Sequence, residues 1–118
     1  MKNEATIKER YLRDPLPVRL GGLAANLARV QSFSDHPKNR DVVKNILEES
    51  KFFIEWTARE ATLDVQAELV ALQRQLSLWH YGWNMLWADE TLREAVAAKA
   101  GQWSQRVLEA SGLLSAAR

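Results

Sequence analysis

Histidine and carboxylate side chains are the groups in this sequence best suited to acid–base chemistry or to metal binding. The chain has two histidines, His36 and His80, and no cysteine, which excludes disulfides, a thiolate metal site and a cysteine nucleophile. A di-iron helical bundle carries Glu-x-x-His on two helices, whereas Phe33 and Ser77 stand three residues before these histidines. We therefore expect no bound metal and no cofactor.

The carboxylates are numerous enough for general acid or base catalysis. Helical spacing nevertheless places most of them on faces turned to water, as a solvated helix requires. The carboxylates in question are Glu48, Glu49, Glu55, Asp64 and Glu68. The sequence has no Gly-rich phosphate loop, no His-Glu-x-x-His and no Gly-x-Ser-x-Gly, and no nucleophile stands beside a recognisable orienting partner. We therefore expect no catalytic residues and no enzymatic activity.

Residues 78–87, with the sequence LWHYGWNMLW, form the most unusual segment of the chain. Trp79, Trp83 and Trp87 recur every four residues, so they share one face of a helix. The simpler interpretation is a core stripe, because indole rings bury a large apolar area and each N–H needs a single partner. The alternative is a pocket for a flat hydrophobic ligand such as a tetrapyrrole, with His80 beside the rings as an axial ligand or hydrogen-bond donor.

A second apolar patch lies on the side of this helix opposite the tryptophans. At 100° per residue Leu78, Tyr81 and Met85 fall together there, within a stretch from residue 75 to residue 88 that has no charge. A helix in a bundle needs one apolar side, so the second side calls for a partner. Aromatic residues and methionine with few charges are typical of the core of a protein interface.

The preceding helix, expected to end at about Arg59, also has apolar residues outside its core-facing side. Phe52 and Trp56 point away from the face that is expected to enter the core. A short N-terminal helix with Ile7, Tyr11 and Leu12 can cover one of the two patches, which leaves the other for a partner. A tilted helix that hides both patches inside the monomer is the alternative. The candidate partner-binding residues are therefore Leu78, Tyr81, Met85, Phe52 and Trp56.

Apolar residues recur at intervals of three and four along the whole chain, which predicts an all-α fold. The first long helix is expected to begin near Pro17 and to end at residues 34–37, which supply capping oxygens for a second helix that runs to about Arg59. The third is expected from a cap at Thr62 or Asp64 along a stripe that reaches Leu86, and the fourth from a cap at Asp89 to Ser111–Gly112. Long helices with short connections pack as antiparallel neighbours. The sequence therefore predicts an antiparallel four-helix bundle over residues 16–114, with a short additional helix within residues 1–14.

Length and composition predict one soluble domain over residues 1–118. A chain of 118 residues with 47% apolar and 26% charged residues can form one core. Sixteen Lys and Arg against 15 Asp and Glu leave a formal net charge of +1, which is too little positive charge to hold a nucleic acid. The polar start and the lack of an apolar run of about 20 residues predict a cytoplasmic chain with no membrane partner.

Two segments, residues 16–27 (LPVRLGGLAANL) and 53–57 (FIEWT), resemble small uncharacterised helical proteins of cyanobacterial type. The resemblance covers most of the chain and implies a cytoplasmic protein without an assigned activity or residue roles. From the residues themselves we expect a non-enzymatic interaction, scaffold or regulatory protein that binds a protein partner or a second copy of itself as a homodimer. The alternative function is a carrier or sensor of a flat hydrophobic ligand.

Overall fold

The computed structural model describes residues 3–116, and over that range the chain is helical without any strand. The all-α prediction is confirmed for these residues, whereas residues 1–2 and 117–118 of the predicted domain lie outside them. The helices are α1 (Glu4–Arg13), α2 (Leu16–Phe33), α3 (Arg40–Thr57), α4 (Leu63–Tyr81), α5 (Trp83–Ala88), α6 (Glu90–Ser111) and α7 (Leu113–Ala116). Two short 3-10 helices, η1 (Pro37–Asn39) and η2 (Ala58–Glu60), lie on either side of α3.

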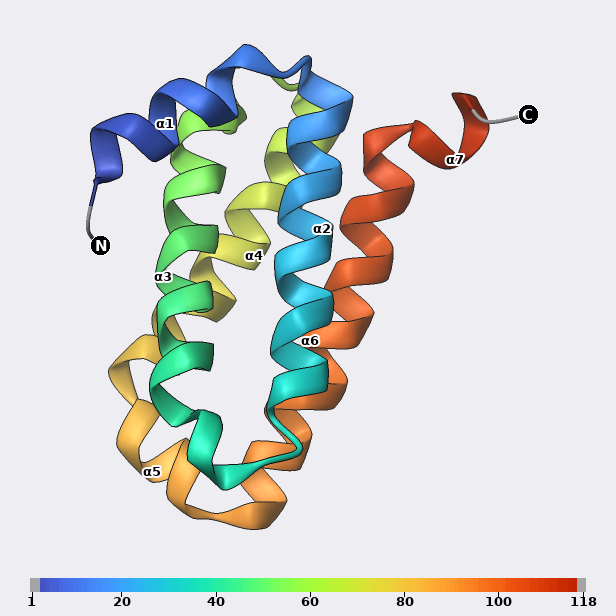
Figure 1. Cartoon of the computed structure of the whole chain (residues 1–118). Coiled ribbons are helices and arrows are strands. Elements are labelled where there is room, and N and C mark those ends of the chain that lie inside the picture. Colours follow the sequence, from blue (N-terminus) through green and yellow to red (C-terminus); the bar gives the residue numbers. More distant parts are fainter. Residues whose placement is uncertain (1–2, 117–118) are drawn as a thin grey trace.

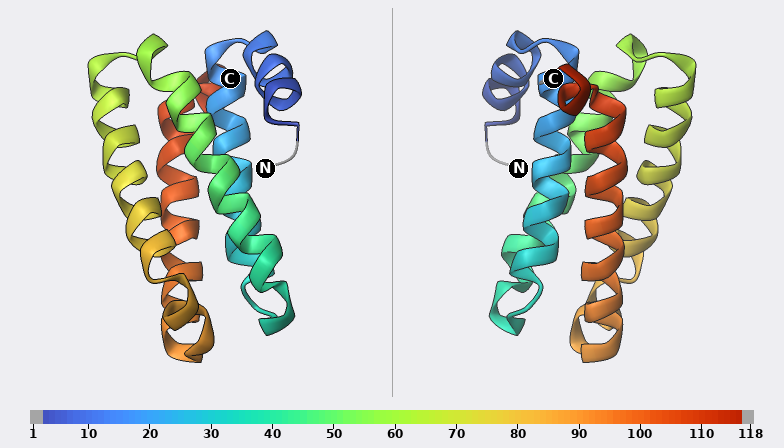
Figure 2. Two further views of the ribbon diagram at one scale, coloured as in Figure 1. Left: turned by 90° about the vertical axis from the view of Figure 1, so that its left-hand side faces the viewer. Right: turned by 90° about the vertical axis from the view of Figure 1, so that its right-hand side faces the viewer.

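The long helices α2, α3, α4 and α6 lie side by side, and successive ones run in opposite directions (Figure 1). Helix α5 extends the lower end of α4, while α1 and α7 lie at the upper end. Figure 2 shows α1 and α4 on opposite sides of the molecule. The N-terminal helix is therefore placed against a different part of the surface from α4.

Helices α2 and α6 pack most extensively, because small residues stand where their backbones approach. The Ser104 hydroxyl of α6 donates to the carbonyl oxygen of Ala24 in α2 at 2.7 Å. A Cβ atom on Gly101 would lie 2.5 Å from the side-chain nitrogen of Gln31. The glycine therefore makes room for a neighbouring side chain.

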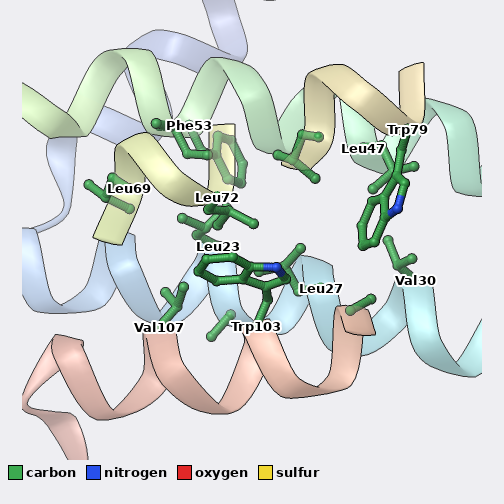
Figure 3. Close-up of a cluster of buried hydrophobic side chains, with 14 of the residues drawn as sticks. Leu23, Leu27, Val30, Leu47, Phe53, Leu69, Leu72, Trp79, Trp103 and Val107 are labelled. Atoms are coloured by element: carbon green, nitrogen blue, oxygen red, sulfur yellow. The ribbon is translucent and has the colours of Figure 1, made fainter. Parts of the chain in front are cut away.

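Leucine and tryptophan side chains fill the space between the long helices. Leu23 and Leu27 of α2 and Leu72 and Leu76 of α4 are fully enclosed. The ring of Trp103 in α6 lies against Leu23, Leu27 and Leu72 in the close-up of this core (Figure 3). Burial of each large apolar side chain contributes about 1.5–3 kcal/mol to folding, so this cluster is the main source of stability.

The predicted third long helix is interrupted, so the expectation that it runs from its cap to Leu86 is wrong. Gly82 has φ −99° and ψ 16°, outside helical values, and separates α4 from α5. The indole N–H of Trp87 in α5 donates to the carbonyl oxygen of Pro37 at 2.8 Å. This contact with the α2–α3 connection, together with the packing of α5 on α6, accounts for the change of direction.

Three helix ends are capped by predicted residues, whereas α1 and α3 begin without a side-chain cap. The Thr62 hydroxyl accepts from the backbone N–H of Val65 at 3.4 Å, so Thr62 rather than Asp64 caps α4. The Asp89 carboxylate accepts from the N–H of Leu92 at 3.0 Å at the start of α6. Gly112 ends α6 with φ 78°, a left-handed conformation that favours glycine.

Candidate partner-binding surface

Helix α4 has apolar side chains on two opposite faces. The inner one belongs to the core, where Leu69, Leu72 and Leu76 are buried. The other one is open to solvent, and its large apolar side chains are Leu63, Val70, Leu78 and Tyr81, which are 82%, 67%, 59% and 94% exposed. Helix α4 therefore satisfies the core and still presents a second apolar face.

We define the outer face of α4 as Leu63, Ala67, Val70, Arg74, Leu78 and Tyr81, all of which are exposed. Successive members stand three or four residues apart. That interval is typical of the seam along which one helix packs against another. Arg74 is the single ionised member, and it has no ion pair within the described part of the chain. The outer face of α4 thus has the pattern of a helix-packing surface without a helix on it.

Beyond the break at Gly82, Met85 of α5 is 70% exposed and continues the apolar surface. A hollow of about 340 Å³ lies at this break and is lined by Lys44, His80, Tyr81, Gly82, Trp83, Asn84 and Met85. The guanidinium of Arg40 donates to the side-chain oxygen of Asn84, which ties the start of α3 to α5. The predicted residues Tyr81 and Met85 therefore lie around one hollow.

A second hollow, of about 330 Å³, lies between α3 and α4 and is lined by Glu48, Lys51, Phe52, Glu55 and His80. Because His80 lines both hollows, they adjoin along the α3–α4 junction. The structure thus brings Phe52 close to the surface that holds Tyr81 and Met85. Charged side chains of both signs stand around this junction, in contrast to the outer face of α4.

Trp56 is not part of the open surface, because α1 covers it. The ring of Tyr11 lies 5.9 Å from that of Trp56, and the ammonium group of Lys8 lies 6.0 Å from the same ring. Tyr11 also stacks on Phe53. The N-terminal helix was expected to cover one of the two patches, and it covers the Trp56 part of the patch on α3, while Phe52 lines the hollow between α3 and α4.

Hydrogen bonds hold α1 in that place. The Tyr11 hydroxyl donates to the carbonyl oxygen of Arg19 at 2.7 Å and accepts from the Thr57 hydroxyl at 3.2 Å. The Arg19 guanidinium donates to both carboxylate oxygens of Glu60, at 2.7 and 2.9 Å, and this pairing lowers the pKa of Glu60. Burial raises the pKa of Tyr11 to about 12, so its phenol stays neutral and keeps donating.

In the predicted ligand pocket the rings of Trp83 and Trp87 lie 5.2 Å apart, whereas His80 is separated from Trp79 and Trp87. Trp79, Trp83 and Trp87 are buried, and the first of them lies in the core beside Val30 and Leu47 (Figure 3). His80 is exposed at the hollows instead, where Trp83 is the only one of the three rings in the lining. The tryptophans therefore pack as a core stripe.

Two large apolar residues of the outer face, Leu63 and Val70, were not among the predicted site residues. The interval of three and four from Leu63 to Tyr81 is visible in the sequence. The core stripe of the same helix has the same interval and is more strongly apolar. The two stripes lie on opposite sides of the helix, half a turn apart. A search for a second repeat, offset from the first, identifies both residues.

A further groove of about 540 Å³ lies beside α1, and Gly21, Gly22, Asn26 and Glu49 are among its lining residues. The buried Asn26 amide donates to the carboxylate of Glu49 at 3.0 Å and to the Ser50 hydroxyl at 3.3 Å. Its side-chain oxygen accepts from a neighbouring arginine. These polar groups are thus already paired within α2 and α3, and the groove is explained by the packing of α1.

Among residues 3–116, no group of three or more His, Asp and Glu is placed to hold a metal ion. No helix in the described chain is long and apolar enough to cross a membrane. No family model matches the chain, and no curated protein or solved structure matches it.

Proposed function

We propose that this chain is a non-enzymatic four-helix bundle of the cytoplasm that docks another protein chain on the outer face of α4. The observation that carries the proposal is the exposure of Leu63, Val70, Leu78 and Tyr81 on one face of a single helix. Monomeric proteins rarely leave a large contiguous apolar patch in water. Burial of these side chains against a partner would remove them from solvent and stabilise the complex.

The composition of this face supports a protein partner. Interface cores are enriched in aromatic residues, methionine and arginine and depleted of lysine and acidic residues. The outer face has Tyr81, its continuation has Met85, and its single charge is that of Arg74. Arginine is also among the residues that most often dominate binding energy.

The shape of the surface favours a helix over a small molecule. With 19 residues, α4 is about 28 Å long, and its outer face is convex along that length. Small-molecule sites are concave and enclose most of the ligand. The carrier of a flat ligand has less support, because His80 stands apart from Trp79 and Trp87.

A non-enzymatic role is supported by where the perturbed groups lie. Perturbed pKa values cluster at catalytic sites in enzymes. Among residues 3–116 the shifted groups are Tyr11, which holds α1 in place, and Arg19 and Glu60, which pair α2 with η2. Their shifts follow from burial and from one ion pair, so they need no catalytic explanation.

Site-specific photocrosslinking in the cells that produce the protein tests the proposal. A photoreactive phenylalanine analogue at Leu78 should give an adduct of discrete mass, because that position would lie inside the complex. The same analogue at Gln105, an exposed position on α6, should give none and serves as the matched control. Equal labelling at both positions, or no adduct from Leu78, would contradict the proposal.

A further inference from the structure

We infer that the chain docked on α4 is a second copy of this protein, packed antiparallel through its own α4 about a two-fold axis between Val70 and Ala71. The inference rests on the proposed function and identifies the partner. It makes the interface isologous, so that the same residues serve on both sides. The arrangement can be checked residue by residue along the outer face.

A two-fold axis places residues at equal distances on either side of it opposite one another in an antiparallel pair. Leu63 and Leu78 are equally far from the axis, so Leu63 of one chain opposes Leu78 of the second copy. Both side chains are large, apolar and exposed. The same leucine contact therefore occurs at both ends of the seam, because Leu63 of each chain faces Leu78 of the other.

The middle of the seam holds small residues. Ala67 and Ala71 are exposed on either side of Val70, so two α4 helices can approach closely there. By the same symmetry Ala67 opposes Arg74 of the second copy, and its short side chain leaves room for the long stem of the arginine. The interface thus accommodates the one charged residue of the outer face.

Charge complementarity favours a second copy over an unrelated helix. Asp64 precedes Ala67 by one turn, so it lies within reach of the guanidinium that covers Ala67 from the second copy. Neither Asp64 nor Arg74 has an ion pair within residues 3–116. In the dimer Asp64 of each chain would pair with Arg74 of the other, which gives two ion pairs by symmetry. An arginine in an apolar seam needs such a partner.

The N-terminal helix of the same chain does not compete for this surface. Its apolar ring, Tyr11, is fastened on α3 by the contacts with Phe53 and Thr57. A single pair of helices buries less surface than the roughly 1,200 Å² of the smaller stable complexes. We therefore expect weak, reversible self-association.

A charge-exchange experiment tests the inference by sedimentation velocity over a wide range of concentration. The wild-type chain should show a reversible monomer–dimer equilibrium. Arg74→Glu should weaken it about tenfold or more, because the new carboxylate faces Asp64 of the second copy. Asp64→Lys should do the same by placing two cations together. Lys99→Glu on α6, which changes the charge equally at another exposed site, should leave it unchanged.

The mixture of the two variants gives the sharpest result. An Arg74→Glu chain and an Asp64→Lys chain restore opposite charges at both contacts, so together they should associate about as tightly as wild type. Asp64 also lies in the first turn of α4, so thermal unfolding must show that each variant is folded. Should Asp64→Lys fail to fold, the dissociation constants of Arg74→Glu and Lys99→Glu still show whether Arg74 lies in the dimer interface.

A monomeric wild-type chain at every concentration would overturn the inference. So would a mixture no tighter than its components, or an Arg74→Glu variant that associates like Lys99→Glu. A monomer that still gives a crosslinked adduct with a different protein at Leu78 would overturn the second copy and leave the proposed function standing. A monomeric chain that gives no crosslinked adduct at Leu78 would overturn both the α4 dimer and the proposed function.

Discussion

The rings of Tyr11 and Phe53 stack with their centroids 3.9 Å apart and their planes within 8° of parallel. This contact places α1 on α3, where Tyr11 also covers Trp56. Helix α1, which could otherwise cover an apolar patch elsewhere on the chain, is thereby held on the α3 side of the molecule. The outer face of α4, on the opposite side, stays open (Figure 2).

Replacement of Tyr11 by alanine should loosen α1. The Tyr11→Ala variant loses the stacking on Phe53 and the hydrogen bond to Arg19, so we expect it to lose about 2–4 kcal/mol of stability in denaturant unfolding. The fluorescence of Trp56 should shift to the red as its ring becomes exposed. Leu12→Ala, an adjacent control that is 40% exposed, should change stability by less than Tyr11→Ala, by about 0.5 kcal/mol. Equal effects from both variants would mean that α1 is not held by Tyr11.

The two faces of α4 should respond differently to truncation. Leu76→Ala opens a cavity in the core and should cost about 2–5 kcal/mol. Leu78→Ala, two residues further along the helix, removes an exposed side chain and should cost no more than about 0.5 kcal/mol. Urea unfolding of both variants measures the difference. A larger loss for Leu78 than for Leu76 would mean that the faces are assigned the wrong way round.

Stability at alkaline pH should depend on Tyr11. Its folded pKa of about 12 lies above the ordinary value near 10, so the folded state prefers the neutral phenol. The contribution is fully present below about pH 10 and is lost as the pH rises towards about 12. Wild type should therefore be more stable than Tyr11→Phe near pH 8, and the gap should close near pH 11. A gap that stays constant would show that the phenol does not titrate in this way.

Tyr81, at the end of the outer face, and Met85, which continues it on α5, can be changed without harm to the fold. Tyr81 and Met85 are largely exposed, so a Tyr81→Glu, Met85→Lys double variant should melt within a few degrees of wild type. It should nevertheless weaken the crosslink formed from Leu78, because it places charges at the end of the interface. Val42→Glu, at an exposed position on α3, is the matched control. An undiminished crosslink in the double variant would exclude Tyr81 and Met85 from the docking surface.

The helices and their caps were predictable from the sequence, because burial on one side of a helix imposes intervals of three and four. Thr62, Asp89 and Gly112 were identified for the same reason that they act as caps: a side-chain oxygen at a helix start or a glycine at its end. The break at Gly82 was not predictable. Trp83 and Trp87 keep the same interval through it, and its cause, the contact of Trp87 with Pro37, joins residues far apart in the chain.

The candidate surface was predictable in part. Leu78, Tyr81 and Met85 lie exposed, as the second apolar side of their helix indicates. Which patch the N-terminal helix covers was left open, because helical spacing on α1 fits either patch equally well. The contacts of Tyr11 decide it, and they depend on the tertiary position of Thr57 and Phe53.

Oxidative crosslinking of single-cysteine variants tests the antiparallel α4 dimer, because the natural chain has no cysteine to interfere. In Ala71→Cys the two thiols of a dimer would lie next to the two-fold axis, close enough for a disulfide. Ala71→Cys should give a disulfide-linked dimer under mild oxidation, and Gln105→Cys should give none at the same concentration. A monomer from both variants, or equal crosslinking from both, would contradict the antiparallel α4 dimer.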